Sequence, residues 1–361
     1  MTTTPELLFD VEDLPPVGLP EAPTARLVLP SGDLDDPVFR GVWELERRKG
    51  IGGSEVAAIL GLDKYRGPRR VYEEKHGYKQ PDNRFMRFGR RMEPVIAAEF
   101  EDETGLKTAM PPGTLAHIEH DWARSNVDRF VLDAFGQVVA PLECKNKSEH
   151  AARQWEDEEE APENAALQAH WNTAIGGWSH SYVAAVIGGN RLKVWRQERD
   201  EELIAELFAF CGDWYQRHIV EGLPPAVDGL KSTTELLARL WECKAEKITD
   251  IDLSVAVDLR TKRAALKDQI EELDDQLTTV ENQMREHAGE NGVVRADGKK
   301  AWSWVTNGNF ASKRFREEQP ELAAKYVHTV EELDLARLKA EQPKVYDRYR
   351  ARVLRVPKKG L

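Results

Sequence analysis

The chain has 361 residues, of which 41% are hydrophobic, and its formal net charge is −12. This length suits one large domain or two modest ones, and the composition allows an ordinary buried core. No apolar run reaches the roughly 18 residues of a membrane helix, and the N-terminus lacks a basic stretch followed by an apolar one. We therefore expect neither a membrane span nor a secretion signal. Three widely spaced cysteines suit a reducing cytoplasm and show no zinc or iron–sulfur spacing.

The acidic net charge differs from the basic excess that nucleic-acid-binding proteins usually show. It does not exclude nucleic-acid binding, because exposed charges are screened beyond about 10 Å at ordinary salt. Local patches of charge, and not the net charge, then determine binding. An acidic protein of that class would have to gather its arginines around its ligand.

Residues 1–38 are rich in proline and acidic residues without a sustained period, which predicts a mostly disordered tail. A globular domain is expected over residues 39–230, closed by Pro224-Pro225. Its predicted helices are Ser54–Leu60, Arg69–His76, Phe85–Glu103, Asn164–Ile175 and Asp200–Val220. Pro94 is expected either in the first turn of its helix or at a kink. Its predicted strands are Arg129–Asp133, Gln137–Lys145, Ser181–Ile187 and Arg191–Gln197.

Residues 231–361 form a predicted C-terminal extension. Two apolar series recur every seven residues: Leu259, Leu266, Leu273 and Val280, and Ile270, Leu277 and Met284. This repeat is typical of a coiled-coil-like helix, and the segment 255–287 fits either oligomerisation or packing on its own chain. A hairpin around Ala296-Asp297-Gly298, a helical stretch and a final strand over Arg350–Val356 are expected to follow.

Three carboxylates and a lysine suggest a catalytic site: Glu93, Asp128, Glu143 and Lys145. Cleavage of a phosphodiester needs divalent ions that activate water and absorb developing charge. Mg²⁺ prefers hard oxygen ligands and keeps several waters, so two or three carboxylates suffice. Residues two apart on a strand share a face, so Glu143 can bind metal while Lys145 reaches water or phosphate. Cys144 then points into the core, although its backbone carbonyl could complete the metal shell.

A Glu-x-Lys pair alone is weak evidence, because the chain contains four Asp/Glu-x-Lys matches: Glu73/Lys75, Glu143/Lys145, Glu242/Lys244 and Asp297/Lys299. Only Glu143/Lys145 ends an apolar strand with an aspartate one hairpin upstream. For this pair alone, solvated charges at a strand end are the better interpretation. Adding Asp128 and Glu93 favours a metal site.

Glu93 shares its side of the helix with Ala97 and Phe100, which places it toward the core. A buried glutamate without a partner is costly. A metal ion would remove that cost, and so would an ion pair with Arg90 or Arg91.

The order helix-Glu, strand-Asp, strand-Glu-x-Lys, helix-Gln resembles the PD-(D/E)xK nucleases. More narrowly, the chain resembles the YqaJ-like viral recombinases, a family of the phage lambda exonuclease type. The matching stretches are Trp43–Gly61, Phe88–Gly105, Trp122–Lys145 and Ala161–Gly177, and the resemblance covers roughly residues 42–229. It implies an α+β, restriction-endonuclease-like core, in which helices flank a mixed central sheet, followed by the long-helix and hairpin extension.

The resemblance also assigns roles. It implies metal ligation by Asp128 and Glu143 and a metal-site role for Glu93. Lys145 would position water or stabilise charge, and Gln168 would support the site. The expected metal is Mg²⁺, with Mn²⁺ as a substitute.

An anion site is predicted upstream, where Gly52-Gly53-Ser54 precedes a helix. Glycines allow close approach of the backbone, Ser54 is a favourable N-cap, and a helix N-terminus carries about half a positive charge. Without the resemblance, a plain helix start and a solvated Arg47 are the better interpretation. With it, Arg47 and Ser54 are expected to hold the 5′-phosphate of the strand being degraded.

Other charged and aromatic residues are less informative. Arg84, Arg87, Arg90 and Arg91 fit a DNA-backbone contact or a solvated helix face equally well. His117 and His120 are expected to be structural, because magnesium does not favour imidazole. Core packing is the expected role of the tryptophans.

The resemblance implies a metal-dependent DNA exonuclease that digests linear double-stranded DNA ends 5′→3′ and leaves 3′ overhangs for phage-type homologous recombination. Expected partners are DNA ends, a single-strand annealing protein and further copies of the chain, without a membrane. If the protein is phage-encoded, its location would be the bacterial host cytoplasm. Two alternatives stay open: a structure-specific endonuclease of the same fold, and a non-catalytic DNA-end-binding scaffold. The complete carboxylate set argues against the scaffold.

Overall fold

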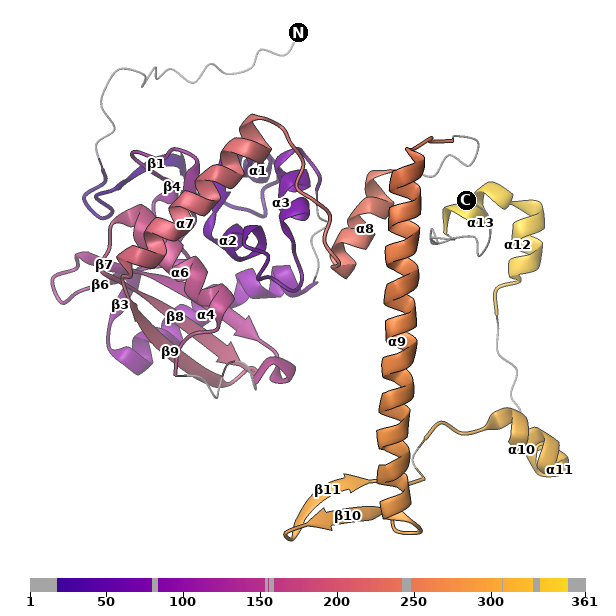
Figure 1. Cartoon of the computed structure of the whole chain (residues 1–361). Coiled ribbons are helices and arrows are strands. Elements are labelled where there is room, and N and C mark those ends of the chain that lie inside the picture. Colours follow the sequence, from indigo (N-terminus) through magenta and orange to yellow (C-terminus); the bar gives the residue numbers. More distant parts are fainter. Residues whose placement is uncertain are drawn as a thin grey trace. The chain divides into compact units, whose positions relative to one another are not determined.

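The computed structural model describes residues 18–79, 84–152, 155, 159–241, 248–306, 308–326 and 332–349, except the side chains of residues 347 and 348. The chain divides into two compact units, Met1–Trp241 and Glu242–Leu361 (Figure 1). Within the described ranges, no helix is both long and apolar enough to cross a membrane.

A five-stranded sheet of order β3-β6-β7-β8-β9 forms the centre of the first unit. Its strands are β3 (Lys107–Ala109), β6 (Arg129–Leu132), β7 (Val138–Lys147), β8 (His180–Ile187) and β9 (Arg191–Glu198). β7 and β8 run parallel, whereas the other neighbours are antiparallel. The expected α+β fold with a mixed central sheet is confirmed.

Helices cover both faces of this sheet. Successive side chains of β7 point to opposite faces, so they meet different helices. Leu142 and Cys144 face helix α4 (Arg84–Thr104), where they pack with Ile96 and Phe100. Glu143 and Lys145 face helix α6 (Glu163–Gly176), with which both interact. Pro94 lies inside α4, not in its first turn.

A second sheet of order β1-β4-β5-β2 corrects the predicted tail. Its strands are β1 (Ala25–Pro30), β4 (Gly113–His117), β5 (Ala123–Ser125) and β2 (Ile51–Gly52). The prediction of disorder over 1–38 is wrong for β1 and for the start of helix α1 (Pro37–Arg48), while residues 1–17 lie outside the described part. β1 is an edge strand, which tolerates proline, and its first residue, Ala25, is fully buried, as is Ala22 just before it.

The remaining helices of the first unit are α2 (Gly53–Ile59), α3 (Pro68–Lys75), α7 (Glu201–Trp214) and α8 (Lys231–Leu240). A 3₁₀ turn (Glu149–Ala151) follows β7, and a π-helical turn (Tyr215–Val220) continues α7. The unit extends through α8, past the predicted boundary at residue 230. Leu236 of α8 is fully buried, and Thr233 Oγ1 donates to Asp228 Oδ1 at 2.6 Å, which ties α8 to the preceding loop.

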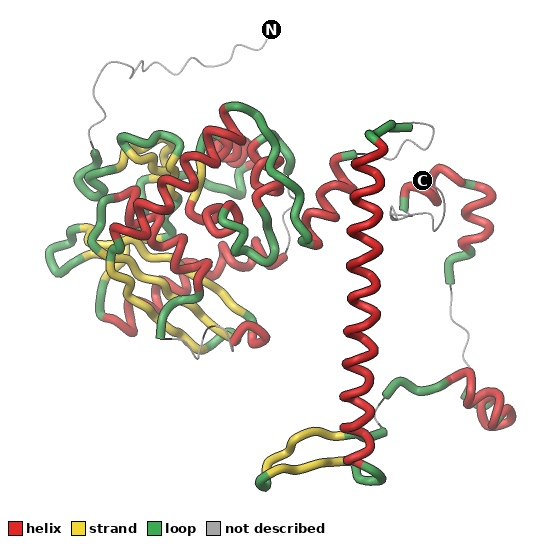
Figure 2. Tube along the Cα trace, in the orientation of Figure 1, coloured by secondary structure: helices red, strands yellow, loops and turns green. Residues whose placement is uncertain are grey.

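The second unit consists of a long helix, a hairpin and short helices (Figure 2). These are α9 (Leu253–Ala288), β10 (Val293–Ala296), β11 (Lys299–Ser303), α10 (Ser312–Glu318), α11 (Pro320–Ala324), α12 (Leu335–Glu341) and α13 (Pro343–Arg348). The heptad pattern and the Asp297-Gly298 turn thus correspond to α9 and to the hairpin. The strand predicted over Arg350–Val356 lies outside the described residues.

Candidate active site

The ammonium group of Lys145 lies at the centre of the candidate site. Its Nζ donates to Glu143 Oε1 at 2.5 Å and to Gln168 Oε1 at 2.9 Å. Glu143 and Lys145 share one face of β7, and Gln168 reaches them from α6. Glu143 is 3% exposed, so its carboxylate is held in place by the protein.

Asp128 reaches the same place from the residue before β6. The register pairs Arg129 with Leu142, so Asp128 lies beside Glu143 where the two strands begin to separate. Asp128 Oδ2 accepts the backbone amide of Cys144 at 2.8 Å. Burial and the charges of Glu143 and Glu93 raise the pKa of Asp128 well above its ordinary value.

Glu93 belongs to α4, which covers the face of the sheet opposite to α6. Its charge nevertheless acts on Asp128 and Glu143. Burial and the carboxylate of Glu143 raise the pKa of Glu93, while Arg129, Lys145 and Arg90 lower it. Arg90, a predicted ion-pair partner of Glu93, lowers the pKa of Glu93 less than Arg129 does. All four residues of the predicted set are therefore within electrostatic reach of one another.

Lys145 is protonated in this arrangement. Burial by itself would lower the pKa of Lys145, but the carboxylates of Glu143 and Asp128 raise it above its ordinary value. A protonated amine has no lone pair with which to accept a proton. Lys145 is therefore suited to stabilise negative charge and to orient water or phosphate by hydrogen bonding.

Sequence reasoning missed Asn172 of α6, which holds Glu143, and Ser125 of β5, which holds Asn172. Asn172 Nδ2 donates to Glu143 Oε2 at 3.4 Å, and Ser125 Oγ donates to Asn172 Oδ1 at 2.7 Å. Asn172 is 1% exposed and lies one turn after Gln168 on the same side of α6. The spacing of four residues from Gln168 is the feature of the sequence that could have indicated a role for Asn172 at the site.

Lys147 is a second lysine on this face of β7. Burial and the nearby charge of Lys145 lower the pKa of Lys147 to about 8. Its Nζ lies 4.6 Å from the ring centroid of Trp155, a distance suited to a cation–π interaction.

The donor set of this cluster suits a divalent metal ion. Asp128 and Glu143 lie near one ammonium group, with Glu93 in electrostatic reach. Burial together with mutual repulsion raises the pKa values of Asp128 and Glu93, so the cluster has an excess of negative charge that a cation would relieve. Within the described residues, no group of three or more His, Cys, Asp or Glu side chains is already arranged to hold a metal ion. Mg²⁺ is commonly bound by one or two carboxylates and keeps its waters, so the pair Asp128 and Glu143 fits it.

A cationic cluster surrounds Glu55 at the start of α2. Glu55 accepts from Arg47 at 3.3 Å, from Arg66 at 3.2 Å and from Lys75 at 2.5 Å. Burial would raise the pKa of Glu55, but the three cations outweigh it and lower that pKa to about 2. Burial also lowers the pKa of Lys75 to about 8 despite its carboxylate partner.

Arg47 and Ser54 are neighbours in this cluster. Arg47 Nη2 donates to Ser54 Oγ at 3.4 Å, and the guanidinium lies over the ring of Trp43 at 4.8 Å. Ser54 is not the N-cap, however. The cap is Gly52, whose amide donates to Glu55 Oε2 at 3.0 Å, because Glu55 at the third helical position closes a capping box.

Comparison with known proteins identifies the family. Residues 42–196 match the YqaJ-like viral recombinase domain. The chain is 32% identical over 295 residues to the uncharacterized protein YqaJ of Bacillus subtilis (strain 168), an alignment that covers 79% of this chain and 90% of that protein. The chain belongs to the YqaJ-like viral recombinase family.

Solved structures similar to this YqaJ-like chain include the alkaline exonuclease LHK-Exo from Laribacter hongkongensis. That structure has a TM-score of 0.40 and 16% identity, over 56% of this chain and all (100%) of the other. LHK-Exo in complex with dAMP also has a TM-score of 0.40, with 17% identity over 50% of this chain and 93% of the other.

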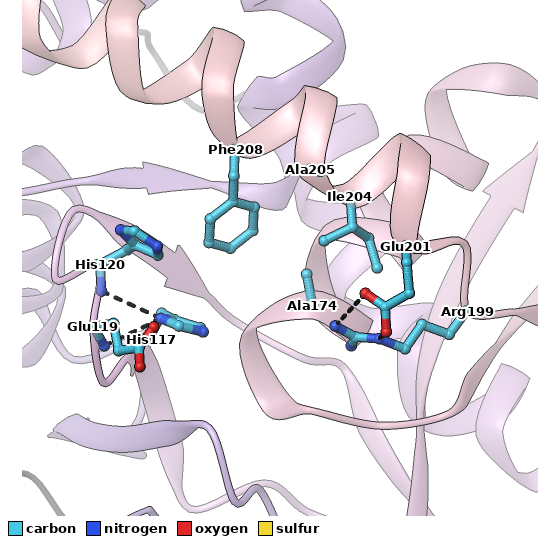
Figure 3. Close-up of a pocket in the computed structure, with 9 residues that line it drawn as sticks. All are labelled: His117, Glu119, His120, Ala174, Arg199, Glu201, Ile204, Ala205 and Phe208. Atoms are coloured by element: carbon cyan, nitrogen blue, oxygen red, sulfur yellow. Dashed lines mark hydrogen bonds and ion pairs between the residues drawn. The ribbon is translucent and has the colours of Figure 1, made fainter.

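A separate pocket of the YqaJ-like chain lies between β4 and α7 (Figure 3). It has a volume of about 250 Å³ and shares no lining residue with either cluster above. His117 Nδ1 accepts the amides of Glu119 and His120, both at 3.2 Å, and the two imidazoles stack. These contacts agree with a structural role for the histidines.

Proposed function

We propose that this chain is a Mg²⁺-dependent DNA exonuclease with a restriction-endonuclease-like core, which digests linear double-stranded ends 5′→3′. The observation that carries the proposal is the convergence of Asp128, Glu143 and Lys145, with Glu93 in electrostatic reach, inside the region that matches the recombinase domain. Such a set of hard oxygens beside one ammonium group suits phosphodiester hydrolysis.

Asp128 and Glu143 would hold the metal, with Glu93 and the backbone carbonyl of Cys144 beside it. When bound, Mg²⁺, or Mn²⁺ in its place, would supply positive charge to the scissile phosphate and increase the acidity of water. Lys145 would donate to the attacking water or to a phosphate oxygen. Gln168 fixes the direction of the ammonium group, and Asn172 fixes the carboxylate of Glu143.

The proposed 5′→3′ polarity depends on the Glu55 cluster. Arg47 and Arg66 both approach Glu55, and Ser54 is exposed beside Arg47, so a 5′-phosphate would meet two guanidinium groups and a hydroxyl. Guanidinium groups bind phosphate by paired, charge-assisted hydrogen bonds. A terminal phosphate held there would direct the adjacent linkage toward Lys145.

Exposed arginines at the start of α4 would attract the rest of the DNA despite the net charge of −12. Arg84, Arg87 and Arg91 are exposed, and α4 also carries Glu93. Contacts of this kind release counterions, so binding should weaken as salt rises. Digestion from 5′ ends would leave a 3′ overhang, the substrate of a single-strand annealing protein, and the enzyme is expected to work as a homo-oligomer.

The test is incubation of purified protein with end-labelled linear duplex DNA, in Mg²⁺ and in EDTA. Release of mononucleotides from 5′-phosphorylated ends in Mg²⁺ alone, lost in Glu143→Gln and Lys145→Ala, would support the proposal. Glu198→Gln, an exposed carboxylate of β9, is the matched control. Cutting of closed circles would indicate a structure-specific endonuclease instead. Binding without cleavage, unchanged by Glu143→Gln, would indicate a scaffold.

A further inference from the structure

Helix α9 exposes a continuous apolar seam along its length. Six members of the two heptad series are each more than half exposed: Leu259, Leu266, Ile270, Leu273, Leu277 and Val280. The hairpin contacts the C-terminal end of α9, where Trp302 Nε1 donates to the carbonyl of Met284 at 3.1 Å. Patches of this kind on a soluble protein mark interaction sites.

The seam has the period of a two-stranded coiled coil. Ile270, Leu277 and Met284 occupy position a of the heptad, after Arg263 at the same position. Position d holds leucine in three successive heptads and then Val280. Position d is apolar over four heptads and position a over three, which is long enough to specify helix pairing.

The flanking charges distinguish the two orientations of a helix pair. Position e is basic in the first half of α9, at Arg260 and Lys267, and acidic in the second half, at Asp274 and Glu281. In an antiparallel pair the e positions of the two helices lie opposite each other. Lys267 then faces Asp274 of the second helix, and the symmetry of the pair produces this contact twice.

A parallel pair would bring like charges together. In register, Arg263 would face its own copy in a core layer, and Lys262 at position g would face Lys267 at position e. The existing pairs Lys262–Asp258 and Glu281–Arg285 lie within the helix and are exposed, so they are weak and can exchange.

We propose that α9 forms an antiparallel two-stranded coiled coil with α9 of a second copy of this chain. Ile270 packs opposite Leu273 of the second copy, and Leu277 packs opposite Leu266. The two-fold axis falls close to Glu271, near the middle of the helix, so the whole seam is covered at once. This contact is independent of the proposed nuclease activity.

Charge reversal in the full-length protein, followed by sedimentation equilibrium, tests the pairing. Lys267→Glu should weaken self-association about tenfold, because it places two glutamates opposite two aspartates. The double variant Lys267→Glu/Asp274→Lys should restore it, since the exchanged charges face each other again. Asp275→Lys is the matched control for Asp274→Lys, because residue 275 lies at position f and faces solvent. A monomeric wild type, an inert Lys267→Glu or a double variant that stays dissociated would overturn the proposal.

A distance measurement fixes the orientation. Spin labels on Thr261→Cys, in a Cys243→Ser background, should be separated by about 30 Å along an antiparallel coil, from a rise of about 1.5 Å per residue. Labels directly opposite each other would show a parallel pair and would also overturn the proposal. Neither measurement depends on nuclease activity, so failure here is distinct from failure of the proposed function.

Discussion

Gly53 of α2 lies against Gln168 of α6 so closely that a methyl group on Gly53 would be 3.1 Å from Gln168 Cγ and 3.1 Å from Asn172 Oδ1. Gln168 accepts from Lys145, and Asn172 donates to Glu143. The start of α2 also carries Ser54 and Glu55. One helix contact therefore joins the cationic cluster to the carboxylate cluster, and in the proposed exonuclease it would set the distance between the bound 5′-phosphate and the scissile linkage.

Gly53→Ala should lower kcat about tenfold, because Gln168 and Asn172 must shift by a few tenths of an ångström and the groups they orient shift with them. The free energy of unfolding should change by no more than about 1 kcal/mol. Gly41→Ala is the control, since an added methyl group at residue 41 of α1 would meet no atom within 4 Å. Steady-state rates and urea unfolding of both variants measure the effect. Full activity in Gly53→Ala would show that the contact does not position the site.

Asn172→Ala should raise the Mg²⁺ concentration for half-maximal activity by roughly 10- to 100-fold, the usual cost of losing a group that orients a metal ligand. The reason is that Glu143 loses its amide partner while keeping its charge. Activity should recover at high Mg²⁺. Asn164→Ala, on the exposed start of α6, should titrate like the wild type. An unchanged Mg²⁺ titration of Asn172→Ala would exclude Asn172 from this role.

Local patterns were sufficient to predict the elements that carry the site. The helix α6 and strands β6 to β9 follow from apolar periodicity and glycine turns, and charge with strand context selected Glu143/Lys145 among four similar pairs. The short strand β1 was missed because its pairing is remote: Ala25 lies opposite His117. A strand this short, which is stabilised by a partner far along the chain, shows little sequence pattern from which it could be predicted.

The unpredicted site residues are neutral or already paired. Asn172 carries no charge and lies between the buried Trp171 and Thr173, and only its spacing from Gln168 indicated a role. Lys75 belongs to the match Glu73/Lys75, which does not end a strand, yet it pairs with Glu55 at 2.5 Å. Glu55 itself was assigned no role, because a capping glutamate cannot be distinguished from an ion-pair partner without its neighbours.

Arg47→Ala should slow digestion of 5′-phosphorylated ends about 10- to 100-fold more than that of 5′-hydroxyl ends, from the typical strength of a charged hydrogen bond. Arg47 is held over Trp43 and beside Ser54, so its guanidinium is already oriented. Lys49→Ala removes an exposed cation just past the end of the same helix and is the matched control. Rates on paired substrates that differ only in the terminal phosphate give the ratio. Equal slowing on both ends would remove Arg47 from phosphate recognition.

Glu55 should make the first unit sensitive to acid. Its pKa is about 2 in the folded protein, below the ordinary value of 4.5, because Lys75, Arg47 and Arg66 outweigh the effect of burial. A lowered carboxylate pKa contributes stability above the ordinary value, and that contribution is lost as pH falls from about 4.5 toward 2. Glu55→Gln should therefore be less stable than the wild type at pH 7, and the difference should shrink over that interval. Urea unfolding between pH 7 and about pH 2.5 measures it, with Glu198→Gln as the exposed control. A difference independent of pH would mean that Glu55 stabilises α2 by its capping hydrogen bond and not by its charge.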